Sequence, residues 1–303
     1  MNLFVTGASG YIGGTVCSAL VAAGHRVTGL ARSEERAAAL RARAIEPVLG
    51  TLADTSLLAR LARDADAVIN AANADDRASV EAMLAAIAGS GRPFIQTSGS
   101  GIVADDAGGE RTDAVYEDST PVHPLPARAA RVALNALIVR AADEGVRCAV
   151  IAPTMVYGRG SGINPDSIQV PKMIAVAKKL GSAKYIGQGA NIWSNVHIED
   201  LADLYLRVLD RAPPGAFYYA ENGENSMREI ATAISRMLGF GGRTESMSTA
   251  EAVAEYGEPM THYSLGSNSR VRAVRARAEL GWSPRRGALL DDIESGSSVA
   301  RDR

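Results

Sequence analysis

Residues 1–14 read MNLFVTGASGYIGG, an apolar run that passes through three regularly spaced glycines into a helical pattern. Residues 3–5 predict a buried strand, and the helix that follows ends at Gly24. Glycines at a G-x-x-G-x-x-G spacing allow a tight turn, a close approach of phosphate and close packing of the helix on the strand. The unpaired N–H groups at the start of the helix attract anions. The stretch therefore predicts a dinucleotide cradle formed by Gly7, Ser9, Gly10, Tyr11, Ile12 and Gly13.

Strand and helix patterns alternate through the first half of the chain. Further strands are expected at 26–30, 45–49, 67–70, 93–97 and 147–151, with helices between them. This alternation predicts an α/β fold with a doubly wound parallel sheet, the Rossmann fold, and a smaller α+β C-terminal substrate lobe. We expect a dinucleotide-binding domain over 1–158 that also receives 192–211, and a substrate-binding lobe from 159–191 and 212–303.

Composition narrows the range of partners. The chain has 303 residues and a net charge of −2 with both signs interspersed, so neither nucleic acid nor an anionic membrane is an expected partner. Cys17 and Cys148 stand in apolar stretches without metal-ligand spacing, and no metal site is expected. The first strand begins too early for a signal peptide, and no apolar run could span a bilayer. We expect a soluble cytoplasmic protein that binds a small molecule.

The residues after the second strand indicate which dinucleotide is bound. Arg32 and Ser33 stand where a carboxylate would bind the ribose 2′-hydroxyl of NAD, and Arg36 follows one helical turn later. A guanidinium suits a 2′-phosphate, so NADP (NADPH) is expected in preference to NAD. The alternative is that both arginines are ordinary solvated charges. Further cofactor contacts are expected from Leu52 in the next turn and from Ala71, Ala72 and Asn73 after the fourth strand, although small residues also suit plain packing.

Hydroxyl groups collect after the fifth strand, in residues 97–101, which read TSGSG. Ligands of doubly wound sheets bind at the carboxyl ends of the strands, so Ser98 and Ser100 are candidate catalytic residues. Small polar residues also cap turns at such positions. Residues 101–126 form a long irregular connection, which we expect to serve as part of a substrate lid. His197, beside the start of a helix, is expected to have a structural role.

Several stretches make the chain resemble the extended short-chain dehydrogenase/reductase superfamily, of the NAD-dependent epimerase/dehydratase type. They are TGASGYIG (6–13), NAA (70–72), PTMVYG (153–158), VHIEDLA (196–202) and LGWSP (280–284). The resemblance implies a cofactor contact at Pro153, a Ser or Thr after strand five, and a Tyr-x-x-x-Lys pair on the following helix. That pair falls on Ala127 and Arg131, so the proton-transferring Tyr is missing, while Arg131 could still hold the cofactor ribose. The chain therefore resembles an atypical branch.

Other departures concern the substrate. Thr51 and Ala152 replace residues common in the family, and Trp193 replaces an Arg that often meets a sugar-nucleotide phosphate. Trp193 with Ile192 suggests a more apolar substrate wall, although aromatic side chains also pack cores.

These observations lead to three hypotheses about function. The first is an atypical NAD(P)-dependent oxidoreductase that uses NADPH to reduce a small, fairly apolar carbonyl compound, with Ser98, Ser100, Tyr157 and Tyr116 as candidate catalytic residues. The second is a non-catalytic NADP-binding sensor that resembles the NmrA-like proteins, and the third is an epimerase or dehydratase. The fold alone cannot choose between them. Helices 75–89 and 127–144 form the dimer face in many relatives, so a homodimer is a further expectation.

Overall fold

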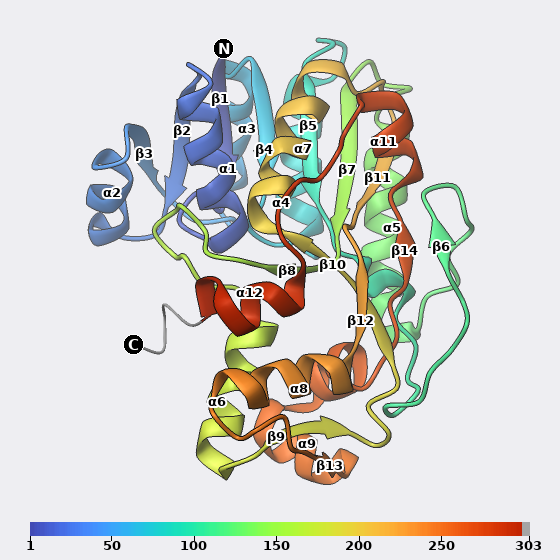
Figure 1. Ribbon diagram of the computed structural model, residues 1–303. Coiled ribbons are helices and arrows are strands. Elements are labelled where there is room, and N and C mark those ends of the chain that lie inside the picture. The colour runs from blue at the N-terminus through green and yellow to red at the C-terminus, as the bar shows by residue number, and fades with distance from the viewer. Residues whose placement is uncertain (299–303) are drawn as a thin grey trace.

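A seven-stranded sheet forms the centre of the computed structural model, which describes residues 1–298 (Figure 1). Its strand order is β11-β7-β5-β4-β1-β2-β3, and every neighbouring pair is parallel. The strands are β1 (Asn2–Thr6), β2 (Arg26–Ala31), β3 (Ile45–Leu49), β4 (Ala67–Asn70), β5 (Pro93–Thr97), β7 (Arg147–Pro153) and β11 (Ala216–Ala220). The order reverses beside β1, as in a doubly wound Rossmann sheet, so the predicted fold class is confirmed.

Helices cover both faces of this sheet, which explains why its inner strands are mostly apolar. In β1, Leu3 and Val5 pack into one core and Phe4 packs into the core on the opposite face. The first core lies under α1 (Tyr11–Ala22), α2 (Glu34–Arg41), α7 (Ile198–Arg211) and α11 (Val274–Leu280). The second lies under α3 (Thr55–Asp64), α4 (Arg77–Ile87) and α5 (Pro126–Arg140).

A smaller lobe with its own core lies beyond the carboxyl ends of the strands (Figure 1). It contains α6 (Gln169–Leu180), α8 (Met227–Met237), α9 (Thr249–Tyr256), α12 (Leu289–Ser295) and the parallel pair β9 (Ala183–Ile186) and β13 (Thr244–Met247). A three-stranded sheet of β8 (Met155–Tyr157), β10 (Ile192–His197) and β12 (Glu224–Ser226) lies between the two parts. Short elements complete the chain: η1 (Ser100–Val103), β6 (Tyr116–Glu117), α10 (Glu258–Met260), the π-helical turn η2 (Thr261–Leu265) and β14 (Val271–Arg272).

One prediction about the lobes is wrong. The predicted boundary at residue 212 assigned β11 to the smaller lobe, but β11 pairs with β7 along its whole length and forms the edge of the main sheet. Backbone hydrogen bonds hold the middle of segment 101–126, expected to be part of a substrate lid, to the smaller lobe. Gly109 N–H donates to Gly266 O at 2.8 Å, and Ala190 N–H donates to Gly109 O at 2.9 Å.

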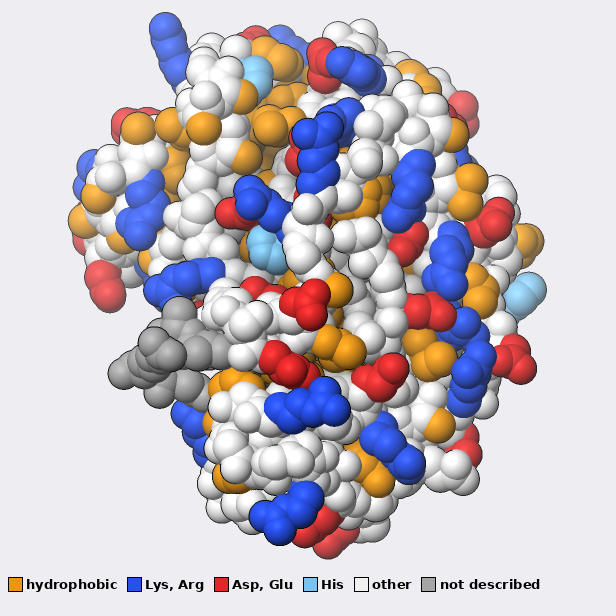
Figure 2. Space-filling model, viewed as in Figure 1, with side chains coloured by type: hydrophobic (Ala, Val, Ile, Leu, Met, Phe, Trp, Pro, Cys, Tyr) orange, Lys and Arg blue, Asp and Glu red, His pale blue; other side chains and the backbone are white. Residues whose placement is uncertain are grey.

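Charged side chains of both signs are mixed over the surface seen in Figure 2, with no continuous basic or acidic area on that face. Within residues 1–298, no helix combines the length and the apolar composition that a membrane crossing requires.

Candidate functional site

The glycine turn between β1 and α1 has the geometry that its sequence predicts. Gly7 has φ +73°, and a Cβ there would lie 2.4 Å from the backbone oxygen of Ala71. A Cβ on Gly13 would lie 2.3 Å from Gly7 O, so this glycine serves to pack the helix on the turn. Gly10 is the N-cap of α1, and no side chain caps this helix start. Backbone N–H groups at such a helix start attract an anion.

A cavity of about 600 Å³ opens beside this turn, and we call it the cofactor cavity. Its lining combines the backbone of the first turn with residues that follow β2, β3 and β4: Gly7, Ser9, Gly10, Leu30, Arg32, Arg36, Thr51, Leu52, Ala71, Ala72, Asn73 and Asn164. All were predicted contacts except Leu30, Thr51 and Asn164. Asn164 comes from the loop after β8, where nothing in the sequence points toward a nucleotide. The size, the bare backbone and the free helix terminus fit a dinucleotide.

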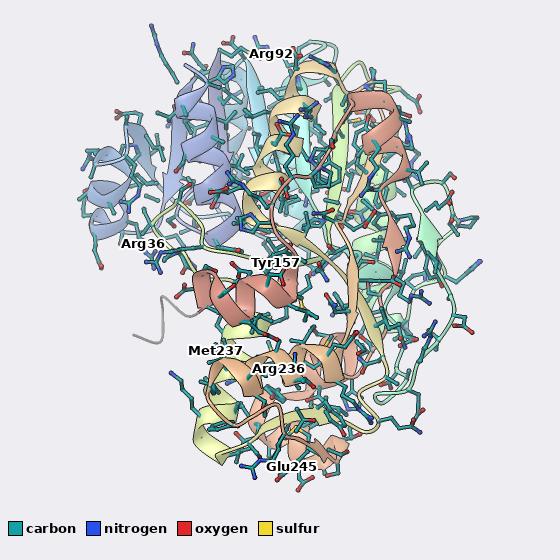
Figure 3. All side chains as sticks on the ribbon, in the orientation of Figure 1. Arg36, Arg92, Tyr157, Arg236, Met237 and Glu245 are labelled. Carbon is teal, nitrogen blue, oxygen red and sulfur yellow. The ribbon has the colours of Figure 1, made fainter. Side chains whose placement is uncertain are left out.

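Two cations stand at the edge of the cofactor cavity. Arg32 and Arg36 are exposed, and neither makes an ion pair within the part of the chain that the structure describes. Arg36 lies at the side of the Rossmann part that faces the smaller lobe (Figure 3). Ser33 does not line the cavity: its Oγ accepts the Arg36 N–H at 3.3 Å and caps α2. The cofactor contact expected of Ser33 stays a prediction.

A second cavity, which we call the substrate cavity, has a volume of about 330 Å³ and lies at the carboxyl ends of β5 and β7. Its lining includes Ser98, Ser100 and Trp193, which were predicted for the substrate site, together with four residues that were predicted to contact the cofactor: Tyr11, Ile12, Arg131 and Pro153. The sequence-based prediction missed Gly99, Gly101, Arg128, Thr154, Val156, Ser167, Ile168, Gln169, Tyr263 and Ser264. Within this lining, segment 101–126 contributes Gly101.

Ser98 and Ser100 both line the substrate cavity, and each hydroxyl oxygen accepts a hydrogen bond, but Ser98 is 8% exposed and Ser100 is more deeply buried. Asn135 Nδ2 donates to Ser98 Oγ at 2.9 Å, so the Ser98 oxygen accepts and its own proton stays available. Ser100 is 1% exposed, and its Oγ lies 2.9 Å from Ser269 Oγ, which donates to it. The sequence analysis did not predict a role for Asn135. An amide in the apolar helix 127–144, one turn after Arg131, could have indicated it.

Arg131 lines the substrate cavity as an ion-paired group. Its Nε donates to Asp75 Oδ1 at 2.7 Å, and its Nη2 donates to Asp75 Oδ2. The hydrogen bonds from Arg131 hold the pKa of Asp75 below its usual value. Ala127, which stands in the predicted Tyr position, is exposed and does not line the cavity, whereas Arg128 does. The sequence of α5, PARAARVALNALIVR, contains no Tyr.

The two predicted tyrosines lie elsewhere. Tyr157 is 1% exposed and donates from its hydroxyl to Gly287 O at 2.7 Å, which anchors the chain just before α12 (Figure 3). Burial raises the pKa of the Tyr157 hydroxyl, so it is a poor acid at neutral pH. Tyr116 lies on β6, which pairs with β14, and lines neither cavity. The predicted catalytic roles of both are therefore wrong, because the side chains are outside the site.

His197 has the structural role predicted for it. Its Nδ1 accepts the Glu199 N–H at 3.2 Å and caps α7. Its ring packs edge-on against Tyr157 with centroids 5.3 Å apart.

A doubly wound sheet with a bare glycine turn and a hydroxyl-bearing cavity at its strand ends defines a dinucleotide-dependent α/β protein. The chain belongs to the NAD dependent epimerase/dehydratase family, whose sequence model matches residues 3–219. The predicted resemblance to extended short-chain dehydrogenases/reductases is thereby confirmed.

Two curated relatives have redox names. Oxidase ucsJ of Acremonium sp is 34% identical, with 97% of this chain and 95% of the relative covered. The 4-hydroxy-2-methyl-3-oxo-4-farnesyl-3,4-dihydroquinoline-1-oxide ketoreductase of Stigmatella aurantiaca is 27% identical, with 94% and 92% covered. Together with the family match, these relatives indicate an NAD(P)-dependent enzyme of oxidoreductase type. The crystal structure of dTDP-glucose 4,6-dehydratase from Bacillus anthracis in complex with NAD superposes with a TM-score of 0.79 at 16% identity, covering 100% of this chain and 97% of that one. This last likeness concerns the fold.

Proposed function

We propose that this protein reduces a small, fairly apolar carbonyl compound with NADPH. The observation that carries the proposal is the Ser98 hydroxyl: it faces the substrate cavity, accepts from Asn135 and keeps its proton for a substrate oxygen. A preorganised donor aimed at a carbonyl oxygen stabilises the negative charge that develops there during reduction. The redox names of the two relatives support the same class of reaction.

The residues of the cofactor cavity would hold the dinucleotide, with its pyrophosphate at the start of α1. When bound and reduced, the nicotinamide supplies a hydride. Ser98 would donate a hydrogen bond to the carbonyl oxygen, and the Asn135 amide would fix the Ser98 rotamer. The proton that completes the alcohol would come from water. Arg131, held by Asp75, contributes a fixed guanidinium to the same cavity wall.

Arg32 and Arg36 support NADPH as the cofactor. Both line the cofactor cavity, and both guanidinium groups are free of carboxylates within residues 1–298. A 2′-phosphate would gain charge-assisted hydrogen bonds from either one.

The remaining lining supports an apolar substrate. Trp193 is 5% exposed and its Nε1 donates to Ser267 O at 2.8 Å, so its ring presents carbon to the substrate cavity. Val156 adds an apolar wall, and Ile168 is 68% exposed at the margin of the cavity. Ile192, which was predicted to share this wall, does not line this cavity.

The test is NADPH oxidation in the presence of a panel of ketones and aldehydes, followed by absorbance. Turnover of at least one apolar carbonyl compound is the expected result. Tight NADPH binding without turnover of any compound would contradict the reductase and favour the NADP sensor. Turnover of a nucleotide sugar without net NADPH consumption would favour an epimerase or dehydratase.

A homodimer through α4 and α5 stays a proposal. No large hydrophobic side chain of these helices is exposed in the structure of residues 1–298. Sedimentation velocity at micromolar concentration would decide it, and a monomer would end the idea.

A further inference from the structure

The end of the substrate cavity nearest the smaller lobe carries a cation that nothing yet accounts for. Arg128 lies in the first turn of α5, three residues before Arg131, so both side chains reach the same cavity. Arg131 is neutralised by Asp75. For Arg128, by contrast, no ion pair exists among the residues the structure describes.

The guanidinium of Arg128 is held in place without a hydrogen-bond acceptor. Its Nε is buried and has no partner within residues 1–298. Its Cζ lies 5.2 Å from the centre of the Tyr263 ring, over the aromatic face. Burial and the neighbouring Arg131 cation lower the pKa of Arg128, and the Asp75 carboxylate partly opposes this shift. A buried donor without an acceptor is energetically costly, and a ligand anion would supply the missing acceptor.

A second unpartnered donor lies on the segment opposite. Ser264 lines the same cavity, and its Oγ is also buried without a partner in the described part of the chain. It follows Tyr263 in the π-helical turn Thr261–Leu265, which the Gly266 N–H closes onto Thr261 O at 2.8 Å. π-helical turns are rare and occur frequently at functional sites. Here the turn brings Tyr263 and Ser264 to a cavity that also receives residues from the ends of β5 and β7, from α5 and from the start of α6.

We propose that Arg128 and Ser264 bind an anionic oxygen of the substrate, a carboxylate or an enolate, at a position separate from the Ser98 hydroxyl. This inference rests on the proposed carbonyl reductase. It defines the substrate class as small carbonyl compounds that carry a second, acidic oxygen group on an apolar body, which Trp193 and Tyr263 contact. The volume of about 330 Å³ suits a small molecule of this kind.

Binding without turnover tests the anion site directly. The protein saturated with NADP⁺ is titrated by calorimetry with 3-phenylpropanoate and with its neutral counterpart, 3-phenylpropanamide. We expect the acid to bind at least about 10-fold more tightly than the amide, because a charge-assisted hydrogen bond contributes roughly one to two factors of ten. Arg128→Gln should abolish this preference, and Ser264→Ala should reduce it.

The matched control is Arg140→Gln, which removes an exposed arginine from the last turn of the same helix and should keep the preference. Equal affinity for the two probes, no measurable affinity for the acid, or a preference that survives Arg128→Gln would overturn the anion site. Loss of NADP⁺ affinity in Arg128→Gln, with an unchanged melting temperature, would overturn it as well, because Arg128 would then bind the cofactor.

The two proposals fail in different ways. If no carbonyl compound is reduced but the Arg128-dependent preference for the acid remains, the reductase falls and the anion site stands. If 3-oxo-3-phenylpropanoate and its methyl ester are reduced with equal KM, the reductase stands and the anion site falls. A KM for the acid at least about 10-fold lower than for the ester, lost in Arg128→Gln, supports both.

Discussion

The cofactor cavity and the substrate cavity differ in what forms their walls. The first is formed largely by backbone and small residues at the ends of four consecutive strands, β1 to β4. The second is formed by side chains from segments that are far apart in sequence, including α5, β8, β10 and η2. Where the backbone forms the wall, adding a side-chain atom should weaken ligand binding. Where side chains form the wall, removing a functional group should change catalysis or specificity. The cofactor cavity should therefore be sensitive to added atoms and the substrate cavity to removed groups.

The largest effect is expected at Gly7. In Gly7→Ala the new Cβ would lie 2.4 Å from Ala71 O on a backbone with φ +73°. The turn must shift to relieve strain of about 3 kcal/mol, and binding would have to restore its original shape. Dinucleotide affinity should therefore fall by about 100-fold. Fluorescence titration with NADPH measures it. Gly24→Ala is the control, because φ is +82° there but nothing lies within 4 Å of the new Cβ. Equal affinity of the two variants would contradict a backbone-formed cofactor cavity.

The second largest effect is expected on kcat, through Ser98 in the substrate cavity. Ser98→Ala removes the hydroxyl donor, and kcat should fall by about 100-fold or more while NADPH affinity stays unchanged. Steady-state kinetics on the best carbonyl compound, with a parallel NADPH titration, separates the two. Ser18→Ala is the control, because its Oγ donates to Gly14 O within α1 and lies outside the substrate cavity. An unchanged kcat in Ser98→Ala would remove Ser98 from the mechanism.

How far the sequence predicts each cavity follows from these differences. Gly7 and Gly10 lie in one short stretch between a predicted strand and a predicted helix, so local sequence was enough to predict the turn that lines the cofactor cavity. Tyr263 and Ser264 reach the substrate cavity only because a π-helical turn of the smaller lobe packs against α5, which no local pattern encodes. The predicted catalytic role of Tyr157 is wrong for a different reason. The local motif was recognised correctly, but the Tyr157 side chain is buried and bonds to Gly287 just before α12.

A smaller effect is expected on the affinity for NADPH relative to NADH. Arg32→Ala and Arg36→Ala should each weaken NADPH binding by about 10-fold and leave NADH binding unchanged, because only NADPH carries the 2′-phosphate. Arg43→Ala is the control: this exposed arginine follows α2, bonds to Ala39 O and lies outside the cofactor cavity. Parallel loss of NADPH and NADH affinity would mean that these arginines do not recognise the phosphate, and the NADPH preference would fall.

The smallest effect is expected on stability, through His197, which caps α7 and packs against Tyr157. Burial lowers the pKa of His197 in the folded protein, although the carboxylates of Glu199, Asp200 and Asp292 partly oppose this and the cation of Arg286 adds to it. The unfolded chain therefore binds the proton first, near pH 6.5, and stability falls as the pH drops below that value. The protonated ring also loses the acceptor that caps α7.

His197→Asn keeps a capping acceptor that does not titrate. Relative to this variant, the wild type should lose about 1 kcal/mol of unfolding free energy between pH 7.5 and pH 5, measured by urea denaturation at both values. His123→Asn, at an exposed position, should show no such difference. If the gap between wild type and His197→Asn is the same at both pH values, His197 does not couple protonation to folding.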